Sequence, residues 1–117
     1  MITKGKVIEG HKKANGIGFP TANILNINNI SSGIYAGKVK FNDDDFGAVI
    51  YIGERRKEIL EAHLFDFGGD LYGVEIEVEV IEKIRDDKVV SDFSLLKEMI
   101  NKDYADAIEI LKKCSRE

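Results

Sequence analysis

The chain has 117 residues, which suits a single domain over residues 1–117, and its 44% hydrophobic and 32% charged residues are an ordinary globular composition that excludes disorder. The net charge of −4 argues against a general nucleic-acid binder, and one cysteine with two histidines argues against a disulfide or a zinc cluster. No apolar run reaches the length of a membrane span and the N-terminus has no secretory pattern, so we expect a cytoplasmic protein without a membrane partner.

Alternation of polar and apolar residues predicts that most of the chain is β-strand. Residues 2–9 form the first expected strand. Residues 33–41 and 46–52 are rich in β-branched and aromatic residues and flank the turn-forming sequence Asn-Asp-Asp-Asp, which predicts a hairpin. Residues 58–67 form the next expected strand. In residues 73–82 valine and isoleucine alternate with glutamate, as a half-buried antiparallel strand requires.

The last part of the chain changes to helical spacing, with apolar residues recurring every turn. This predicts a helix over about residues 93–113, with Asp92 or Ser94 as its N-cap. Several short strands with few residues between them favour a small closed or nearly closed barrel over about residues 1–90, because closure removes exposed strand edges. The helix would then cover one opening or one flank of the barrel.

The segment Gly-Ile-Gly-Phe-Pro-Thr-Ala-Asn, residues 16–23, contains the only proline of the chain and follows a loop with two lysines. Glycines let a backbone approach a ligand closely, and Thr21 and Asn23 offer a hydroxyl and an amide. The segment could therefore present N–H groups to phosphates while these two side chains face a hard cation. The alternative is a surface turn containing a proline, and these residues alone favour it.

The strand expected over residues 58–67 carries a candidate general base. Alternation places Leu60 and Ala62 on one face and Glu61 and His63 on the other. A carboxylate on a strand whose other face is core has a rigid mount, which a general base needs. Spacing alone nevertheless favours a solvated Glu61 and a hydrogen-bonded packing role for His63.

Together these segments resemble the riboflavin kinase family, the ATP-dependent enzymes that convert riboflavin to FMN. The resemblance is carried, in the family's order and approximate spacing, by GKVIEGH, GFPTAN, GIYAGKV, YIG, EAHLFDFGGDLYG, IEKIRDDK and LLKEMINKDYADA. It implies a mainly β protein, a small six-stranded antiparallel Greek-key barrel with a C-terminal α-helix, which binds ATP and riboflavin in adjoining clefts. We expect a monomer that transfers a phosphoryl group from ATP to the 5′-hydroxyl of riboflavin, giving FMN and ADP, with Mg²⁺ as the cofactor.

The resemblance also implies roles for individual residues. Glu61 matches the family's catalytic carboxylate, which would accept the proton of the terminal ribityl hydroxyl as it attacks the γ-phosphorus. Thr21 and Asn23 would lie at Mg²⁺ and the nucleotide phosphates. Arg85 matches an arginine near the flavin and its new phosphate, and the alternative is an exposed cation paired with its neighbours. The loop ahead of Thr21 would be a flap over the nucleotide, and its expected binding residues are Gly10, Lys12, Lys13, Gly16, Gly18, Phe19 and Pro20.

The chain departs from the family pattern in three places. Ala14-Asn15 replaces a Gly-Arg pair, so a hinge and a phosphate-directed cation are absent there, and Lys12 or Lys13 could compensate. Glu-Arg-Arg-Lys-Glu follows the Tyr-Ile-Gly motif in place of a longer Pro-Thr-Phe segment, which would shorten one wall of a pocket. Many bacterial relatives carry an adenylyltransferase domain ahead of this one, for which 117 residues leave no room, so FMN would be the final product of a complete chain.

These departures motivate an alternative function, a non-catalytic flavin- or nucleotide-binding barrel derived from the same family. Thr21, Asn23 and Glu61 argue against it, because a pure binding protein has no need of all three. A small-barrel nucleic-acid binder is disfavoured by the net acidity and by the lack of a strand face that combines aromatic and basic residues. We therefore expect no nucleic-acid partner.

Overall fold

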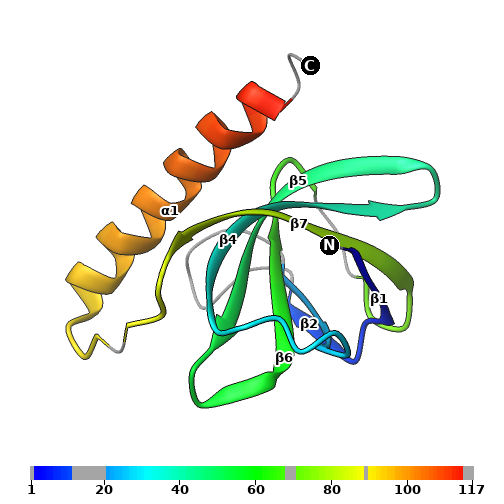
Figure 1. Ribbon diagram of the computed structural model, residues 1–117, viewed down its shortest axis with the longest axis horizontal. Helices are drawn as coiled ribbons and strands as arrows, with labels where there is room; N and C mark the ends of the chain where they lie inside the picture. Colours follow the sequence, from blue (N-terminus) through cyan, green and yellow to red (C-terminus); the bar gives the residue numbers. More distant parts are fainter. Residues whose placement is uncertain (1, 12–20, 68–70, 89, 115–117) are drawn as a thin grey trace.

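The computed structural model describes residues 2–11, 21–67, 71–88 and 90–114, which form antiparallel strands followed by one helix (Figure 1). The elements in this part of the chain are β1 (Ile2–Lys6), β2 (Glu9–His11), β3 (Thr21–Leu25), β4 (Gly33–Phe41), β5 (Asp44–Gly53), β6 (Arg56–Leu64), β7 (Glu75–Arg85) and α1 (Phe93–Cys114). The expected mainly β fold with a C-terminal helix is confirmed.

The strands form one sheet in the order β1-β7-β4-β5-β6-β3-β2. The strand expected over residues 2–9 is interrupted at Val7 and Ile8: β1 forms its first part, and β2 begins at Glu9 and continues to His11. β1 pairs with β7 at one edge of the sheet and β2 pairs with β3 at the other. At the interruption the N–H of Val7 donates to the carbonyl of Val74 and that of Ile8 donates to Asn23, both at 2.9 Å. One bent strand therefore joins the two edges into a nearly closed barrel, and counting it once gives the six expected strands.

The bend brings β1 close to β3, and Gly5 permits that approach. A Cβ atom on Gly5 would lie 3.1 Å from the Cβ of Ile24, which is tighter than ordinary side-chain contact. Apolar residues from alternate positions of the strands fill the barrel, as the alternation predicts. Members of this core that are below 2% exposed are Ala22, Ile24, Val39, Ala48, Ile50, Ile52, Leu60, Ala62, Leu64, Ile76 and Val78.

Two tight turns connect β4 to β5 and β5 to β6. Phe41 pairs with Asp44 across the first turn, and both central residues, Asn42 and Asp43, have positive φ angles of 51° and 65°. That conformation suits the twist of a hairpin, so the turn is shorter than the four residues expected and β5 begins at Asp44. In the second turn Gly53 pairs with Arg56. A minimal hairpin connection therefore stands where the family has its longer Pro-Thr-Phe segment.

The alternative of a surface turn over residues 16–23 is wrong at the end of that segment, because Thr21–Leu25 is strand β3. β3 pairs with β6 on one side and with β2 on the other. Ala22 and Ile24 are completely buried in the barrel. Burial of these alternate apolar residues, together with backbone pairing on both sides, outweighs the turn-forming composition of the preceding residues.

Helix α1 lies along one flank of the barrel, which is one of the two expected positions (Figure 1). Oδ1 of Asp92 accepts hydrogen bonds from the N–H groups of Ser94 (2.9 Å) and Leu95 (3.3 Å), so Asp92 is the N-cap and Ser94 belongs to the helix. A second apolar cluster joins the helix to β4 and β5 and consists of Ile34, Ala36, Val49, Ile100, Tyr104 and Ala107.

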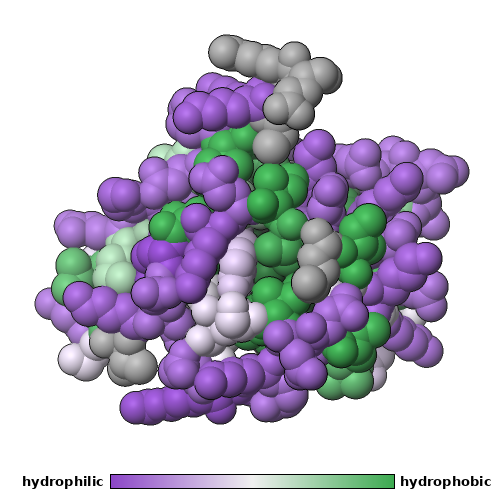
Figure 2. All heavy atoms as spheres, in the orientation of Figure 1, coloured by the Kyte–Doolittle hydropathy of each residue, from purple (hydrophilic) through white to green (hydrophobic). Residues whose placement is uncertain are grey.

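Polar side chains cover most of the face seen in Figure 2, and apolar ones form a band down its middle. Within the described ranges, no helix combines the length and the apolar character needed to span a bilayer.

Candidate active site

The pairing of β3 with β6 brings the two sequence motifs together. Thr21 lies opposite His63 and Asn23 lies opposite Glu61 in this antiparallel pair. Directly opposite residues project to the same face of a sheet, and the residues between them fill the barrel, so all four side chains project from its outer surface. We call these four residues the β3–β6 quartet. The register thus places the expected catalytic carboxylate beside the expected metal and phosphate ligands.

Members of the quartet differ in their access to solvent. Thr21 and Asn23 are 4% and 5% exposed, and His63 is 5% exposed. The side chain of Glu61 is 38% exposed. Glu61 is therefore the member whose charged group can meet a substrate, while the strand beneath it is anchored by the barrel core.

Thr21 has a side-chain oxygen suited to a cation. Its Oγ1 is buried and has no hydrogen-bond partner in the part of the chain that the structure describes. Leaving such a group unsatisfied costs about 1–3 kcal/mol, which a bound ligand would recover. Asn23 lies on the same strand face and adds an amide oxygen. Magnesium binds oxygen ligands and usually keeps water molecules and substrate phosphates in its coordination shell. The uncharged oxygens of Thr21 and Asn23 fit such an ion when nucleotide phosphates supply the remaining ligands.

The described residues do not form a metal site from protein groups alone. Among the described residues, no three His, Cys, Asp or Glu side chains come together as metal ligands. A cation beside Thr21 and Asn23 would therefore depend on the phosphates for most of its charge neutralisation.

His63 connects Glu61 to helix α1. Its Nδ1 lies 2.7 Å from Oη of Tyr104, at hydrogen-bonding distance, and its Nε2 lies 3.6 Å from Oε1 of Glu61. The imidazole also contacts the ring of Tyr51, with centroids 4.4 Å apart. The expectation that His63 is a hydrogen-bonded packing residue is confirmed.

Two tyrosines beside His63 remain neutral phenols at ordinary pH. Burial raises the pKa of Tyr104 well above its usual value, and the nearby charges of Glu61 and Asp103 raise it further. Burial likewise raises the pKa of Tyr51, with the Asp103 carboxylate as the next cause. Both hydroxyls therefore keep a proton to donate.

Arg85 lies at the end of β7 and is fixed to the helix. Its Nε and Nη2 donate to the two carboxylate oxygens of Asp103, each at 2.8 Å, and its Nη1 donates to the carbonyl of Asp86 at 3.1 Å. The hydrogen bonds to Asp103 are the main cause that raises the pKa of Arg85. Asp103 is 1% exposed and accepts a third hydrogen bond from the hydroxyl of Tyr51 at 3.3 Å. The alternative of an exposed cation paired with its chain neighbours is therefore wrong, because the main partner is a buried helix residue.

Asp103 and Tyr104 were not anticipated from the sequence. Both occupy the helix face that carries Ile100 and Ala107, where an amphipathic helix normally places apolar residues. An aspartate buried at such a position needs a cation or several hydrogen-bond donors as partners. The charged residue at an apolar helix position was therefore the sequence signal that could have indicated a buried ion pair.

The expected nucleotide-binding loop lies mostly outside the described residues. This applies to Lys12, Lys13, Gly16, Gly18, Phe19 and Pro20, and also to Ala14 and Asn15. Gly10 is described and lies in β2 opposite Ala22, so the beginning of the expected flap is a strand.

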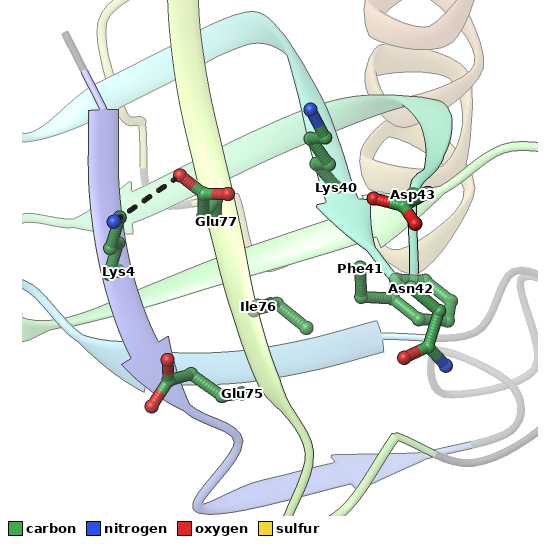
Figure 3. Close-up of a pocket in the computed structure, with 8 residues that line it drawn as sticks. All are labelled: Lys4, Lys40, Phe41, Asn42, Asp43, Glu75, Ile76 and Glu77. Atoms are coloured by element: carbon green, nitrogen blue, oxygen red, sulfur yellow. Dashed lines mark ion pairs between the residues drawn. The ribbon is translucent and has the colours of Figure 1, made fainter.

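A surface hollow of about 220 Å³ lies elsewhere, between β1, β7 and the β4–β5 turn (Figure 3). Side chains of both charges line it, and Lys4 forms an ion pair of 3.8 Å with Glu77 there. Its lining contains no member of the quartet, so it is separate from the place where the sequence motifs meet.

The fold and the quartet combine a nearly closed antiparallel barrel with a half-exposed carboxylate, a buried hydroxyl and a buried amide on adjacent strands. The family model for riboflavin kinase, Flavokinase, matches residues 1–111. The chain therefore belongs to the riboflavin kinase family.

Individual relatives agree with this assignment. The chain is 41% identical over 112 residues to a bifunctional riboflavin kinase/FMN adenylyltransferase of Haemophilus influenzae, a match that covers 88% of this chain and 36% of that protein. It is 31% identical over 111 residues to an RNA-binding riboflavin kinase of Bacillus subtilis, covering 89% of this chain and 48% of that protein. The chain thus spans less than half the length of either relative.

A solved structure shares the fold. The crystal structure of riboflavin kinase from Trypanosoma brucei superposes with a TM-score of 0.67 at 22% identity, covering 96% of this chain and 77% of that one.

Proposed function

We propose that the chain transfers the γ-phosphoryl group of ATP to the 5′-hydroxyl of riboflavin, giving FMN and ADP. The observation that carries the proposal is the register of β3 against β6, which places Glu61 opposite Asn23 and two residues from His63, itself opposite Thr21. Family membership supplies the reaction, and this geometry supplies residues that could perform it. Phosphoryl transfer depends mostly on positioning and on charge neutralisation, which suits a rigid barrel surface.

Glu61 is proposed as the general base. Its carboxylate accepts the proton of the terminal ribityl hydroxyl while that oxygen forms a bond to the γ-phosphorus. The bond between the γ-phosphorus and the bridging oxygen breaks, and ADP leaves with the electron pair. The exposure of 38% lets the side chain reach a bound substrate, and a strand mount limits how far it can move.

Thr21 and Asn23 are proposed to hold Mg²⁺ together with the nucleotide phosphates. A magnesium ion bound there would neutralise charge on the phosphate oxygens as it develops. The two side chains fix the position of the phosphates relative to Glu61, because all three lie on paired strands.

Arg85 is proposed to contact the flavin side of the site. Asp103 fixes two of its donors and Asp86 a third, so its guanidinium would act from one defined orientation. We further propose that the protein acts in the cytoplasm as a monomer and binds no nucleic acid, consistent with its net charge of −4.

The proposal is tested by incubating the protein with riboflavin, Mg²⁺ and ATP and separating the products by chromatography. We expect a peak of FMN that depends on all three additions. The alternative, a non-catalytic flavin- or nucleotide-binding barrel, predicts that calorimetry detects binding of riboflavin or ATP while no FMN forms. That result would overturn the kinase proposal.

A further inference from the structure

We propose that His63 is a positioning residue for Glu61 and that helix α1 holds it in place through Tyr104. The inference rests on the proposed function, in which Glu61 is the general base. Its starting observation is a continuous line of groups from the helix to the carboxylate: Tyr104 Oη, His63 Nδ1, His63 Nε2 and Glu61 Oε1.

The donor and acceptor capacities of these groups determine in which direction each hydrogen bond is donated. A carboxylate can only accept, so a favourable contact with Glu61 requires a proton on Nε2 of His63. A neutral imidazole then has a lone pair on Nδ1, which must accept the proton of the Tyr104 hydroxyl. Tyr104 keeps that proton because it is a buried, neutral phenol. Each group thus donates toward Glu61.

His63 has little freedom to take another position. It is 5% exposed and lies between the rings of Tyr51, at a centroid distance of 4.4 Å, and Tyr104, at 6.0 Å. In the described part of the chain its Nε2 makes no hydrogen bond, and the Glu61 oxygen at 3.6 Å is slightly beyond hydrogen-bonding distance. In the proposed arrangement the Glu61 carboxylate is turned slightly toward Nε2, which brings the two atoms within hydrogen-bonding distance.

The helix is itself fixed at this point. Asp103, the residue before Tyr104, accepts hydrogen bonds from Tyr51 and Arg85, which lie on β5 and β7. Adjacent helix residues therefore attach α1 to the sheet and present the Tyr104 hydroxyl to His63. The helix contributes to the site by orienting the imidazole beside the carboxylate of Glu61.

Two substitutions of His63 separate positioning from packing. The side-chain nitrogen of glutamine can replace Nε2, whereas the shorter asparagine reaches only the place of Nδ1. We expect His63→Gln to retain most of kcat and His63→Asn to lower kcat about tenfold, with both KM values within about twofold of wild type, because orientation of a base acts in the transition state. The inference would be overturned if both variants lost kcat equally, or if KM increased while kcat stayed unchanged.

Tyr104→Phe tests the helix end of the line. It should lower kcat severalfold without changing KM, and Tyr35→Phe is the matched control. Tyr35 is also buried and donates a 2.7 Å hydrogen bond, to the carbonyl of Ser31, but it lies on the inside of the barrel. A control that lowers kcat as much as Tyr104→Phe would mean that general loosening of the fold is the cause, and would contradict the inference.

A spectroscopic measurement tests the same hydrogen-bonding arrangement independently of catalysis. Nitrogen NMR of the imidazole, assigned with the His63 variants, should show a protonated Nε2 and an unprotonated Nδ1, and Tyr104→Phe should move the Nδ1 signal. The opposite tautomer in the wild type overturns the inference even if FMN is formed. The expected tautomer in a protein that forms no FMN overturns the proposed function instead, and leaves the hydrogen-bonded line supported.

Discussion

Asn23 and Glu61 lie directly opposite each other on β3 and β6, although they come from two motifs that are far apart in the chain. The same pairing places Thr21 opposite His63. The candidate site therefore consists of two residues from β3 and two from β6, and the residues of each pair are two positions apart. The barrel core beneath the two strands keeps the distances between these residues constant.

Glu61→Gln should lower the rate of FMN formation by about 100-fold or more, because the amide keeps the shape of the side chain but cannot accept the proton. Binding of riboflavin and ATP, measured separately by calorimetry, should change little. Glu77→Gln is the matched control, since Glu77 is a partly exposed glutamate on the outer surface of β7 that pairs with Lys4. Unchanged turnover in Glu61→Gln would remove this residue from the mechanism.

Thr21→Ala and Asn23→Ala should weaken binding of Mg²⁺–ATP more than binding of riboflavin, because their oxygens are assigned to the cation and the phosphates. Thr3→Ala is the matched control: Thr3 is fully buried on β1, and its hydroxyl accepts a hydrogen bond from Asn28 at 2.9 Å. Calorimetry with each ligand alone gives the comparison. Equal loss of both ligands would show that these residues support the fold of β3 and do not act as ligands.

Local patterns predicted the elements that dominate this fold. The glutamate alternation of β7 and the apolar alternation of β6 correctly separated core from outer face, and helical spacing with Asp92 located α1. These signals are local, because each depends only on the residues of one element. The division of the first strand was not predicted, since it falls where the chain changes its pairing partner from β7 to β3, and both partners are distant in sequence.

The features of the site that the sequence did not predict depend on pairing between segments that are distant in the chain. Resemblance suggested Thr21, Asn23 and Glu61 separately, but only the β3–β6 register shows that they share a face. The alternative interpretation of Arg85 paired it with neighbouring acids, because it considered only the residues of its own loop. Asp103 reaches it from the helix, and such tertiary contacts leave no trace in local periodicity.

Arg85→Ala should lower the free energy of unfolding by about 3 kcal/mol, because it removes the cation that compensates a buried carboxylate. Asp103 is 1% exposed and its charge has no ready access to water. Lys83→Ala is the control, since Lys83 pairs with Asp86 at the surface and such pairs contribute less than about 1 kcal/mol. Urea unfolding of both variants measures the difference, and similar values for the two would contradict a structural role for the Arg85–Asp103 pair.

The free energy of unfolding should fall at alkaline pH because of Tyr51 and Tyr104. Burial raises the pKa of both phenols in the folded protein, so the folded state holds protons that the unfolded state releases above about pH 10. Below that pH both states are protonated and the two tyrosines contribute no slope. Above it, each phenol should reduce stability by up to about 1.4 kcal/mol per pH unit until its folded pKa is reached. Urea unfolding between about pH 9 and pH 11 measures this slope. The double variant Tyr51→Phe/Tyr104→Phe should show a clearly smaller slope than the wild type, and an identical slope would mean that other groups cause the alkaline loss.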